Sequence, residues 1–428
     1  MRLALVSDVF PPKCGGSGWS TFYLAQALQQ RGHQVAVVVP KEGHSFGHSQ
    51  RLYEGLEITE FIYPAARLPF VRNYTRNERL YPRFAAFLEN FFREHEIEVA
   101  HGQHYLTIPP TVMAAQRTGI VSVATVRDYW PLCYWTTHLR GSQICPGCSA
   151  INRLKCLPAN QGALGLVAAP LSLYMGANLR LKQHWLAQAD ATLAVSSYIG
   201  EKLASFVPSE RLHILPNFVD LDELEREAKP APLAPEAAAP FLLYVGKLEE
   251  NKGIRLLLDL LRQARPALPT LIAGDGALRA EIEQVVLAEG LNLKILGWVE
   301  HAEVLRLLAR TELLLFPSLW PEPLSRVLLE ATGLGTLVLA MDTGGTPDIL
   351  RSGENGLLAH HLPEMVAQLQ SILKPENSLE RIRLRQQARR TTQENFSKEV
   401  VVSRVEELYK RLAVKRAGPE KPGSQFQR

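Results

Sequence analysis

The sequence predicts an α/β protein with two Rossmann-like, doubly wound domains that face each other across a cleft. Three observations lead to this prediction. Short apolar runs alternate with segments of helical periodicity, as parallel strands alternate with their crossover helices. The alternation fills the first 220 residues and restarts at residue 241. Between the two series lies AKPAPLAPEAAAP, a stretch too rich in proline and alanine to form a core element.

The first series opens with a strand, a glycine-rich turn and a helix. Residues 3–6 predict the strand, PPKCGGSG predicts the turn, and residues 19–31 have helical periodicity. The elements that follow are predicted as a strand at 35–39, a helix at 81–94, a strand at 99–101, a helix at 111–117 and a strand at 121–126. We expect this domain to span residues 1–220, with a cysteine-containing insert at 129–160.

The second series repeats the pattern. Its strands are predicted at residues 241–245, 270–273, 294–296, 313–316 and 336–340, with helices between them. We expect a linker at 221–240 and a second domain at 241–392. A terminal helix at 393–415 and a disordered tail at 416–428 complete the predicted organisation.

Composition and charge are those expected of a large enzyme. The chain has 428 residues, of which 46% are hydrophobic, enough for a core in each of two domains. Its formal net charge of +4 is small for this length and gives no indication of a nucleic-acid partner. No secretory signal opens the chain and no apolar stretch reaches the ~20 residues that span a bilayer, so we expect a cytoplasmic protein. The longest apolar stretch, residues 162–177, leaves open a buried helix or hairpin and a membrane-facing surface.

Two glutamates eight positions apart, Glu322 and Glu330, are the most informative residues. A strand is predicted to end at Pro317 and a helix to begin after Pro323, which places Glu322 in the loop and Glu330 about two turns inside the helix. Eight helical steps rotate Glu330 by only ~80° from Glu322, so both carboxylates can serve one ligand. The free N–H groups of the helix N-terminus favour a phosphate. Together these groups indicate a ligand with hydroxyls and phosphates, such as a sugar nucleotide.

Six segments resemble one known family, in the same order along the chain. They are FPPKCGGSGWSTFYLAQALQQRGHQVAVV, LAVSSYIGEKL, ILPNFVD, LYVGKLEENKG, IAGDG with LGWV, and the glutamate segment. Over about residues 1–412 the chain resembles a retaining glycosyltransferase of family 4 (glycosyl transferases group 1), whose fold is called GT-B. The resemblance implies a hexosyltransferase that moves sugar from a nucleotide-sugar donor to a glycan, lipid-linked or polysaccharide acceptor, in cell-surface polysaccharide or glycolipid synthesis.

The resemblance also implies a donor-binding site. Lys247 and Lys252 would contact the donor diphosphate, although the family usually has arginine at the first position. Glu330 would accept hydrogen bonds from the ribose, and Glu322 would hold the transferred sugar. The other implied donor contacts are Trp298 and Val299 at the base, Leu324 and Ser325 at the distal phosphate, and Gly15 and Gly16 at the diphosphate. At the position of Ser325 the family usually has glycine. A nicotinamide fingerprint is the rival interpretation of CGGSG, but its spacing does not fit.

One segment departs from the family. A histidine commonly follows a first-domain strand in a T-x-H-D-like segment, whereas residues 125–128 are Thr-Val-Arg-Asp. Arginine is not a base at ordinary pH, so we expect Arg127 to position a phosphate or the acceptor, with Asp128 as its orienting partner. His101 and His104 follow the preceding strand and are candidates to lie nearby, although a lone histidine is more often structural. The implied catalytic set is Glu322, Lys252, Arg127 and Asp128. No D-x-D pair stands where another transferase fold holds its metal, so we expect catalysis without a cofactor.

Four cysteines, Cys133, Cys145, Cys148 and Cys156, lie within the insert. Clustered thiols in a chain without an export signal more often bind metal than form disulfides, which favours a structural zinc site over reduced thiols or disulfides. The surrounding aromatic residues Tyr129, Trp130, Tyr134 and Trp135 are expected to be core or to stack on an acceptor sugar. Basic residues in this half are consistent with peripheral association with a membrane that carries a pyrophosphate-linked lipid, or with a solvated surface.

Two other classes of function stay open from the sequence. One is a sugar-nucleotide epimerase or phosphorylase on the same scaffold. The other is a non-catalytic sugar-nucleotide or glycan-binding protein, which only the Arg127 departure favours.

Overall fold

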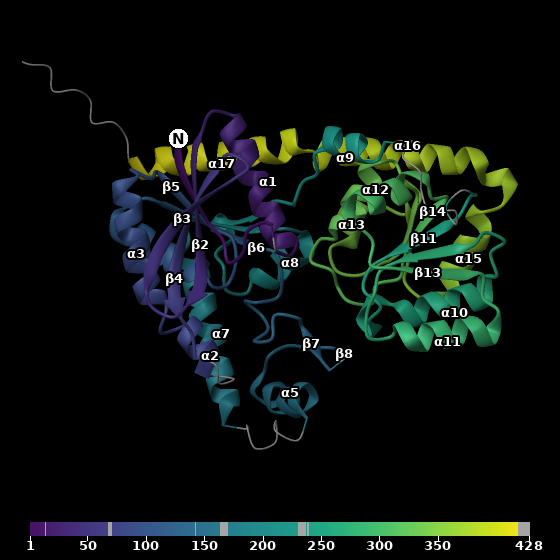
Figure 1. Cartoon of the computed structure of the whole chain (residues 1–428), viewed down its shortest axis with the longest axis horizontal. Helices are drawn as coiled ribbons and strands as arrows, with labels where there is room; N and C mark the ends of the chain where they lie inside the picture. The colour runs from purple at the N-terminus through teal and green to yellow at the C-terminus, as the bar shows by residue number, and fades with distance from the viewer. Residues whose placement is uncertain are drawn as a thin grey trace, which may run out of the picture.

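The protein is described by a computed structural model that covers residues 1–12, 14–66, 71–141, 143–162, 170–229, 237 and 239–417. Figure 1 shows two lobes side by side, each with its own sheet, and two long helices that run along one edge of both lobes. Both sheets are predominantly parallel, so the α/β prediction of two doubly wound domains is confirmed.

The first lobe has an eight-stranded sheet in the order β10-β9-β6-β5-β1-β2-β4-β3. Every pair of neighbours is parallel except β3 and β4 at one edge. The strands are β1 (Arg2–Val6), β2 (Gln34–Gly43), β3 (Gly47–Tyr53), β4 (Leu56–Pro64), β5 (Val99–Gly102), β6 (Val121–Val126), β9 (Ala191–Ala194) and β10 (Leu212–Ile214). The helices are α1 (Gly16–Gln30), α2 (Val71–Arg76), α3 (Tyr81–Glu94), α4 (Ile108–Thr118), α5 (Ala150–Gln161), α7 (Leu171–Gln188) and α8 (Ser197–Leu203). The insert adds a small hairpin of β7 (Leu139–Arg140) and β8 (Gln143–Ile144) beside α5.

The second lobe has a six-stranded parallel sheet in the order β13-β12-β11-β14-β15-β16. Its strands are β11 (Leu242–Val245), β12 (Thr270–Ala273), β13 (Leu293–Gly297), β14 (Leu313–Phe316), β15 (Val338–Met341) and β16 (Leu357–Ala359). Its helices are α10 (Ile254–Ala264), α11 (Arg279–Glu289), α12 (His301–Arg310), α13 (Arg326–Gly333), α14 (Thr346–Ile349), α15 (Leu362–Ile372) and α16 (Ser378–Asn395). The central strands are fully buried and almost entirely apolar, as expected of a parallel sheet covered on both faces.

The end of the chain differs from the predicted single helix at 393–415. Helix α16 ends at Asn395 and α17 (Lys398–Ala417) begins after a break, because Phe396 is buried and Ser397 pairs with Val219. The tail predicted at 416–428 therefore starts inside a helix, and residues 418–428 lie outside the described part of the chain.

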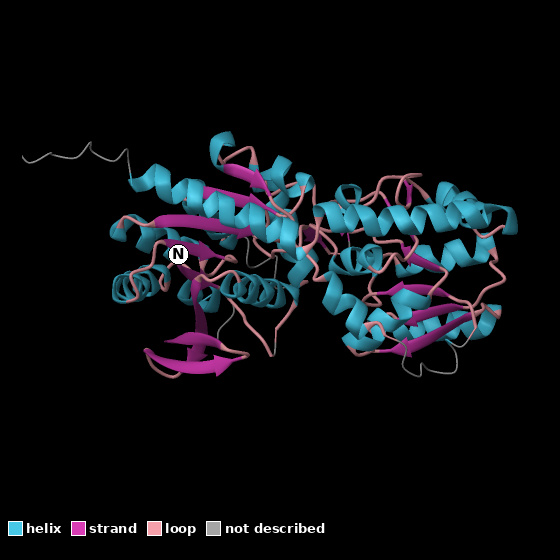
Figure 2. Cartoon of the chain, turned by 90° about the horizontal axis from the view of Figure 1, so that it is seen from above, coloured by secondary structure: helices cyan, strands magenta, loops and turns pink. Residues whose placement is uncertain are grey.

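Helix α17 returns to the first lobe (Figures 1 and 2). Its apolar face packs against the eight-stranded sheet and α1, and the buried residues of that face are Val401, Val402, Val405, Leu408 and Tyr409. Arg31 at the end of α1 donates to Ser403 and Glu406 of α17. The first core is therefore completed by the last helix, a pairing that no local sequence pattern predicts.

The predicted linker at 221–240 begins with a helix, α9 (Leu221–Glu227). Asp220 caps it by accepting a hydrogen bond from the N–H of Glu223, and Leu224 is buried in the core. Residues 230–236 and 238 lie outside the described residues, as do residues 163–169 of the apolar stretch. Among the helices that the structure describes, none combines the length and apolarity needed to cross a bilayer.

Candidate active site

The two glutamates lie on either side of the start of α13. Ser325 caps this helix by accepting a hydrogen bond from the N–H of Leu328, so the helix begins at Arg326, within one residue of the predicted start at Ser325. Glu330 is therefore just over one turn inside the helix rather than about two. The ~80° rotation predicted between the carboxylates does not apply, because residues 322–325 are not helical. Glu322 and Glu330 instead contact different partners.

Glu322 pairs with Lys252 from the neighbouring loop. The Lys252 ammonium lies 2.5 Å from Glu322 Oε1 and 4.4 Å from the ring centre of Trp320, and Ser318 donates to the same carboxylate oxygen. The next residue, Gly253, has a φ of +73° and packs so closely on the loop that a Cβ would lie 1.7 Å from the Pro317 carbonyl oxygen. Because only glycine fits there, the backbone fixes Lys252 beside Glu322.

Glu330 is almost fully buried and contacts the side chains of Arg326 and His301. Its Oε1 lies 2.9 Å from Arg326 Nε and 3.0 Å from His301 Nε2. The hydrogen bond to Glu330 raises the pKa of His301, although burial opposes it. The three side chains line a cavity of about 1050 Å³ whose other wall comes from α1, where the Arg326 guanidinium lies 5.0 Å from the ring centre of Tyr23. Sequence reasoning missed His301 and Tyr23, although His301 follows the predicted base-contacting segment directly.

Of the other predicted donor contacts, Gly16 lines this cavity. Gly15 caps α1 and Gly16 opens it, and a Cβ added to either would meet no atom within 4 Å, which leaves space for a ligand. Lys247 is mostly exposed and its ammonium lies 3.7 Å from Glu249, so its contact with the donor diphosphate stays a prediction. Trp298 is 72% exposed, whereas Val299 and Leu324 pack in the core.

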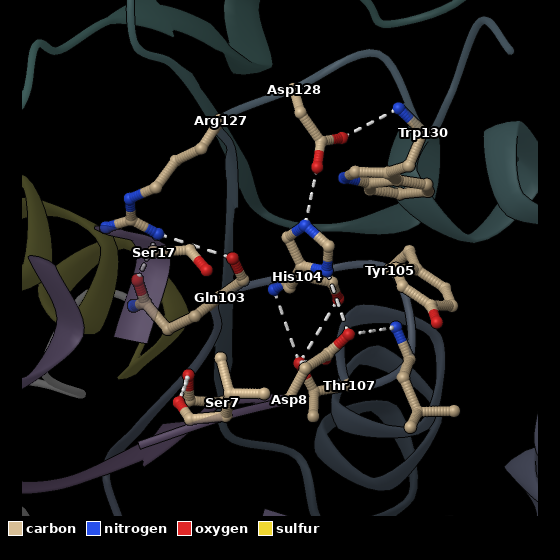
Figure 3. Close-up of polar contacts among 12 residues, drawn as sticks. Ser7, Asp8, Ser17, Gln103, His104, Tyr105, Thr107, Arg127, Asp128 and Trp130 are labelled. Atoms are coloured by element: carbon tan, nitrogen blue, oxygen red, sulfur yellow. Dashed lines mark hydrogen bonds and ion pairs between the residues drawn. The ribbon is translucent and has the colours of Figure 1, made fainter. Parts of the chain in front are cut away.

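Three side chains from adjacent strands form a second polar cluster (Figure 3). Asp8, His104 and Asp128 each stand two residues past the end of β1, β5 or β6, and these strands are neighbours in the sheet. His104 Nδ1 lies 2.8 Å from Asp8 Oδ2, and Nε2 lies 2.6 Å from Asp128 Oδ2. Burial would lower the pKa of His104, but the two carboxylates raise it to about 10. At neutral pH His104 is therefore a cation held between two anions.

The predicted pairing of Arg127 with Asp128 is wrong. Arg127 points away from Asp128 and donates to Gln103 Oε1 at 2.6 Å and to Asn217 Oδ1 at 3.1 Å (Figure 3). The carboxylate of Asp128 instead contacts the His104 ring and accepts a hydrogen bond from the N–H of Trp130. The physical reason is the alternation of side chains at the strand end, which sends consecutive residues to opposite sides. Burial lowers the pKa of Arg127 to about 10, so it still carries its charge at neutral pH.

His101 lies inside the first core. Its ring nitrogens lie 2.5 Å from Tyr409 Oη on α17 and 2.6 Å from Thr125 Oγ1. Burial holds the pKa of His101 well below its usual value, with a smaller effect from Arg127. His101 is thus a neutral residue that ties α17 to the sheet.

The four insert cysteines do not form the predicted zinc site. All five cysteines of the chain are free thiols, and within the described residues no group of three or more His, Cys, Asp and Glu side chains could hold a metal ion. The thiols have other neighbours: Cys145 Sγ contacts the Gly147 carbonyl, and Asn160 donates to Cys156 Sγ. Burial raises the pKa of Cys148 to about 11, which keeps it protonated. Of the three alternatives, reduced thiols agree with the structure.

The cysteine insert packs against the loop that carries Glu322. Trp320 Nε1 donates to the Thr137 carbonyl at 2.7 Å, and the Tyr129 hydroxyl donates to the Pro321 carbonyl. Tyr129 and Trp130 are fully buried and Tyr134 is 7% exposed, so the first two are core residues rather than sugar-stacking platforms. Tyr129 thus connects the cysteine insert with the loop that carries Glu322.

Comparison with known proteins agrees with this geometry. The family model for Glycosyltransferase Family 4 matches residues 14–223, and the model for Glycosyl transferases group 1 matches residues 225–391. Alpha-D-kanosaminyltransferase of Streptomyces kanamyceticus is 26% identical over 216 residues, which cover 47% of this chain and 55% of that protein. Glycogen synthase of Mycobacterium tuberculosis is 25% identical over 445 residues, which cover 97% of this chain and 95% of the synthase.

Solved structures show the same fold. The crystal structure of Anabaena Alr3699/HepE in complex with UDP has a TM-score of 0.68 at 16% identity and covers 96% of this chain and 100% of its own. Sucrose-phosphate synthase from Thermosynechococcus elongatus has a TM-score of 0.65 at 19% identity and covers 96% of this chain and 98% of its own. The fold is GT-B, as the resemblance implied. Taken with the two family models, it identifies the chain as a glycosyltransferase of family 4, a hexosyltransferase that uses a nucleotide-sugar donor.

Proposed function

We propose that this enzyme transfers a hexose from a UDP-sugar, with retention at the anomeric carbon, to a glycan or lipid-linked acceptor in cell-surface polysaccharide or glycolipid synthesis. The observation that carries the proposal is the pairing of Lys252 with Glu322 just before α13, the helix whose Glu330 lines the large cleft. Anabaena HepE, a structural neighbour, was solved with UDP and with UDP-glucose, which favours uracil as the donor base.

In this proposal the donor lies across the cleft. Glu330 exchanges Arg326 and His301 for the ribose hydroxyls. The diphosphate meets Lys252, the open amides at Gly15 and Gly16, and the N-terminus of α13 at Leu324 and Ser325. Glu322 accepts hydrogen bonds from the transferred sugar. These groups neutralise the charge that grows on the leaving diphosphate as the glycosidic bond breaks, so the reaction proceeds without a metal.

His104 and Asp128 serve the acceptor side. With a pKa near 10, His104 keeps its proton at neutral pH and is a poor general base. An oxygen of the departing diphosphate therefore takes the proton of the acceptor hydroxyl. The imidazolium of His104 holds the carboxylates of Asp8 and Asp128 in place, and Asp128 orients the acceptor. Arg127 acts through Gln103 and Asn217 as a positioning residue.

The test compares Glu322→Gln and Lys252→Met with a matched variant of an exposed lysine after α15, Lys374→Met. A thermal-shift screen of UDP-, GDP- and ADP-sugars first identifies the donor, because a ligand that binds the folded state raises the melting temperature. We expect Glu322→Gln and Lys252→Met to lose at least about 100-fold in kcat, equal to about 3 kcal/mol of transition-state stabilisation. Lys374→Met should lose less than tenfold. Full transfer activity in Glu322→Gln would refute the role of this residue.

The enzyme works in the cytoplasm at a membrane surface. Residues 129–189 contain five Lys and Arg residues and no Asp or Glu. On α5 and α7 the apolar side chains of Ile151, Leu154 and Leu173 are exposed. A basic surface with exposed apolar side chains suits an anionic membrane. Co-sedimentation with phosphatidylglycerol vesicles should fall in Ile151→Ser/Leu173→Ser, and binding that is unchanged would contradict the assignment.

A further inference from the structure

A second large cavity lies between the insert, α7 and α8, away from the nucleotide cleft. Its volume is about 670 Å³, which is within the usual range of small-molecule sites. Residues of the β7–β8 hairpin and the following loop form one wall, α7 forms the second, and α8 forms the third. We call this cavity the insert pocket. It is large enough for more than a single ion.

The insert pocket carries only positive formal charge. Arg153, Arg180 and Lys202 line it, and no Asp or Glu is among its lining residues. Arg153 is fixed by donating to the carbonyls of Ser172 and Cys148. Neither Arg180 nor Lys202 has a carboxylate within 4.0 Å among the described residues. Three unneutralised cations around one cavity repel each other, and an anion between them removes that cost.

The rest of the wall is apolar or weakly polar. Leu132, Ile144 and Leu179 contribute apolar surface, and the side chain of Gln183 is partly exposed. A simple inorganic anion would leave the apolar side chains without an apolar group to pack against. The pocket therefore suits an anionic group attached to a larger organic molecule.

Stacked aromatic rings lie between the insert pocket and the loop that carries Glu322. His138 lines the pocket and stacks on Tyr129 with ring centres 4.7 Å apart, and the ring of Tyr198 lies 6.5 Å from the same ring. On its other side Tyr129 donates to the carbonyl of Pro321, directly before Glu322. A ligand in the insert pocket therefore lies next to the place where the sugar is transferred.

We propose that the insert pocket binds the acceptor through a phosphate or diphosphate group, held by Arg153, Arg180 and Lys202. This inference rests on the proposed function, because it presumes that Glu322 marks the transferred sugar. Arginine and lysine together provide both bidentate and point-charge recognition of phosphate oxygens. The cysteine insert is then the element that gives this enzyme its acceptor class, and its thiols pack the wall of the pocket.

The test uses the full chain with saturating UDP, so that the donor diphosphate site is filled. Calorimetric titration with inorganic pyrophosphate then measures the affinity of the insert pocket for a diphosphate. We expect Arg180→Gln/Lys202→Gln to bind pyrophosphate at least tenfold more weakly while the Kd for UDP stays within twofold. The matched control is Arg404→Gln/Lys415→Gln, which removes the same two charge types from exposed positions of α17. This control should bind pyrophosphate like the wild type.

Two results would overturn the inference. One is wild-type protein that binds UDP but no pyrophosphate, and the other is a control variant that loses as much affinity as the pocket variant. Failure to bind UDP would instead contradict the proposed function. Phosphatidylcholine vesicles that contain farnesyl diphosphate, compared with soluble glucose 1-phosphate, then identify the source of the phosphate. Competition by the vesicles alone assigns a lipid headgroup, and competition by the soluble ester assigns a sugar phosphate.

Discussion

The substitution Asp128→Asn tests the electrostatics of the acceptor-side cluster most directly. It removes one of the two negative charges beside His104 and keeps an oxygen that can accept the hydrogen bond from the N–H of Trp130. The shape of the cluster is preserved, so any change in the titration of His104 reports the lost charge.

The magnitude follows from the two short contacts. The carboxylates of Asp8 and Asp128 lie 2.8 and 2.6 Å from the ring nitrogens and raise the pKa of His104 from 6.5 to about 10. This rise equals about 5 kcal/mol at about 1.4 kcal/mol per pH unit. Because burial opposes the rise and Asp128 has the larger effect of the two carboxylates, Asp128 contributes at least half of the rise. Asp128→Asn should therefore lower the pKa of His104 by about 2, which is about 3 kcal/mol.

The assay is a titration of histidine-labelled protein by NMR from about pH 6 to about pH 11, a range that brackets the pKa of a perturbed histidine. The signal of His104 is assigned by its absence in His104→Gln. Asp342→Asn is the matched control, because Asp342 lies 3.2 Å from a different histidine, His360. A His104 midpoint that is the same in Asp128→Asn and in the wild type would refute the reasoning.

The same shift fixes the sign of the pH dependence. The folded-state pKa of His104 is raised, so its contribution to the free energy of unfolding is complete below about pH 6.5 and is lost as the pH rises toward 10. The pKa of His101 is depressed, so His101 costs stability as the pH falls below about 6.5. In Asp128→Asn this contribution should be smaller and should be lost completely at a lower pH, because the folded-state pKa is less raised.

Three further predictions concern the donor side. Gly253→Ala should lower the free energy of unfolding by more than about 3 kcal/mol, measured by urea denaturation, because its Cβ would overlap the Pro317 carbonyl; Gly290→Ala, which has a positive φ and open space, should cost about 1 kcal/mol. Glu330→Gln should weaken UDP binding about tenfold or more in calorimetry, since charge-assisted hydrogen bonds are worth about 1.5–3 kcal/mol, and an unchanged Kd would remove Glu330 from the ribose site. Transfer activity should persist in excess EDTA, and activity that disappears with chelator and returns with manganese would contradict metal-independent catalysis.

Much of the fold follows from local sequence. The strands predicted at 121–126, 270–273 and 313–316 have the same bounds in the structure as β6, β12 and β14, and the helix predicted at 81–94 is α3. Buried parallel strands are continuous apolar runs, so their limits are sharp in the sequence. The break between α16 and α17 was missed because it depends on Ser397 pairing with Val219, 178 positions earlier.

The site was predictable in part. The resemblance named Lys252, Glu322 and Glu330, and the structure gives each of them a partner of opposite charge. The sequence did not predict that Asp128 contacts His104 rather than Arg127. That pairing depends on the side of the sheet to which each side chain points at the end of its strand. Counting two residues past three neighbouring strands would have found Asp8, His104 and Asp128 together. The cysteine spacing was a misleading signal, since spacing alone does not fix where thiols point.

The return of α17 to the first lobe makes that lobe discontinuous in the chain. The chain passes from one lobe to the other twice, and backbone hydrogen bonds join the two passages. The N–H of Val219 donates to the Phe396 carbonyl, and the N–H of Lys398 donates to the Val219 carbonyl. During synthesis the first core therefore stays open until the last helix emerges, after the second lobe has been made. A fragment that ends at residue 220 would expose the surface that Val401, Val402 and Val405 cover, and would be prone to aggregate. The first lobe cannot be exchanged between relatives as one continuous segment; an active hybrid must take α17 from the parent that supplies the first lobe.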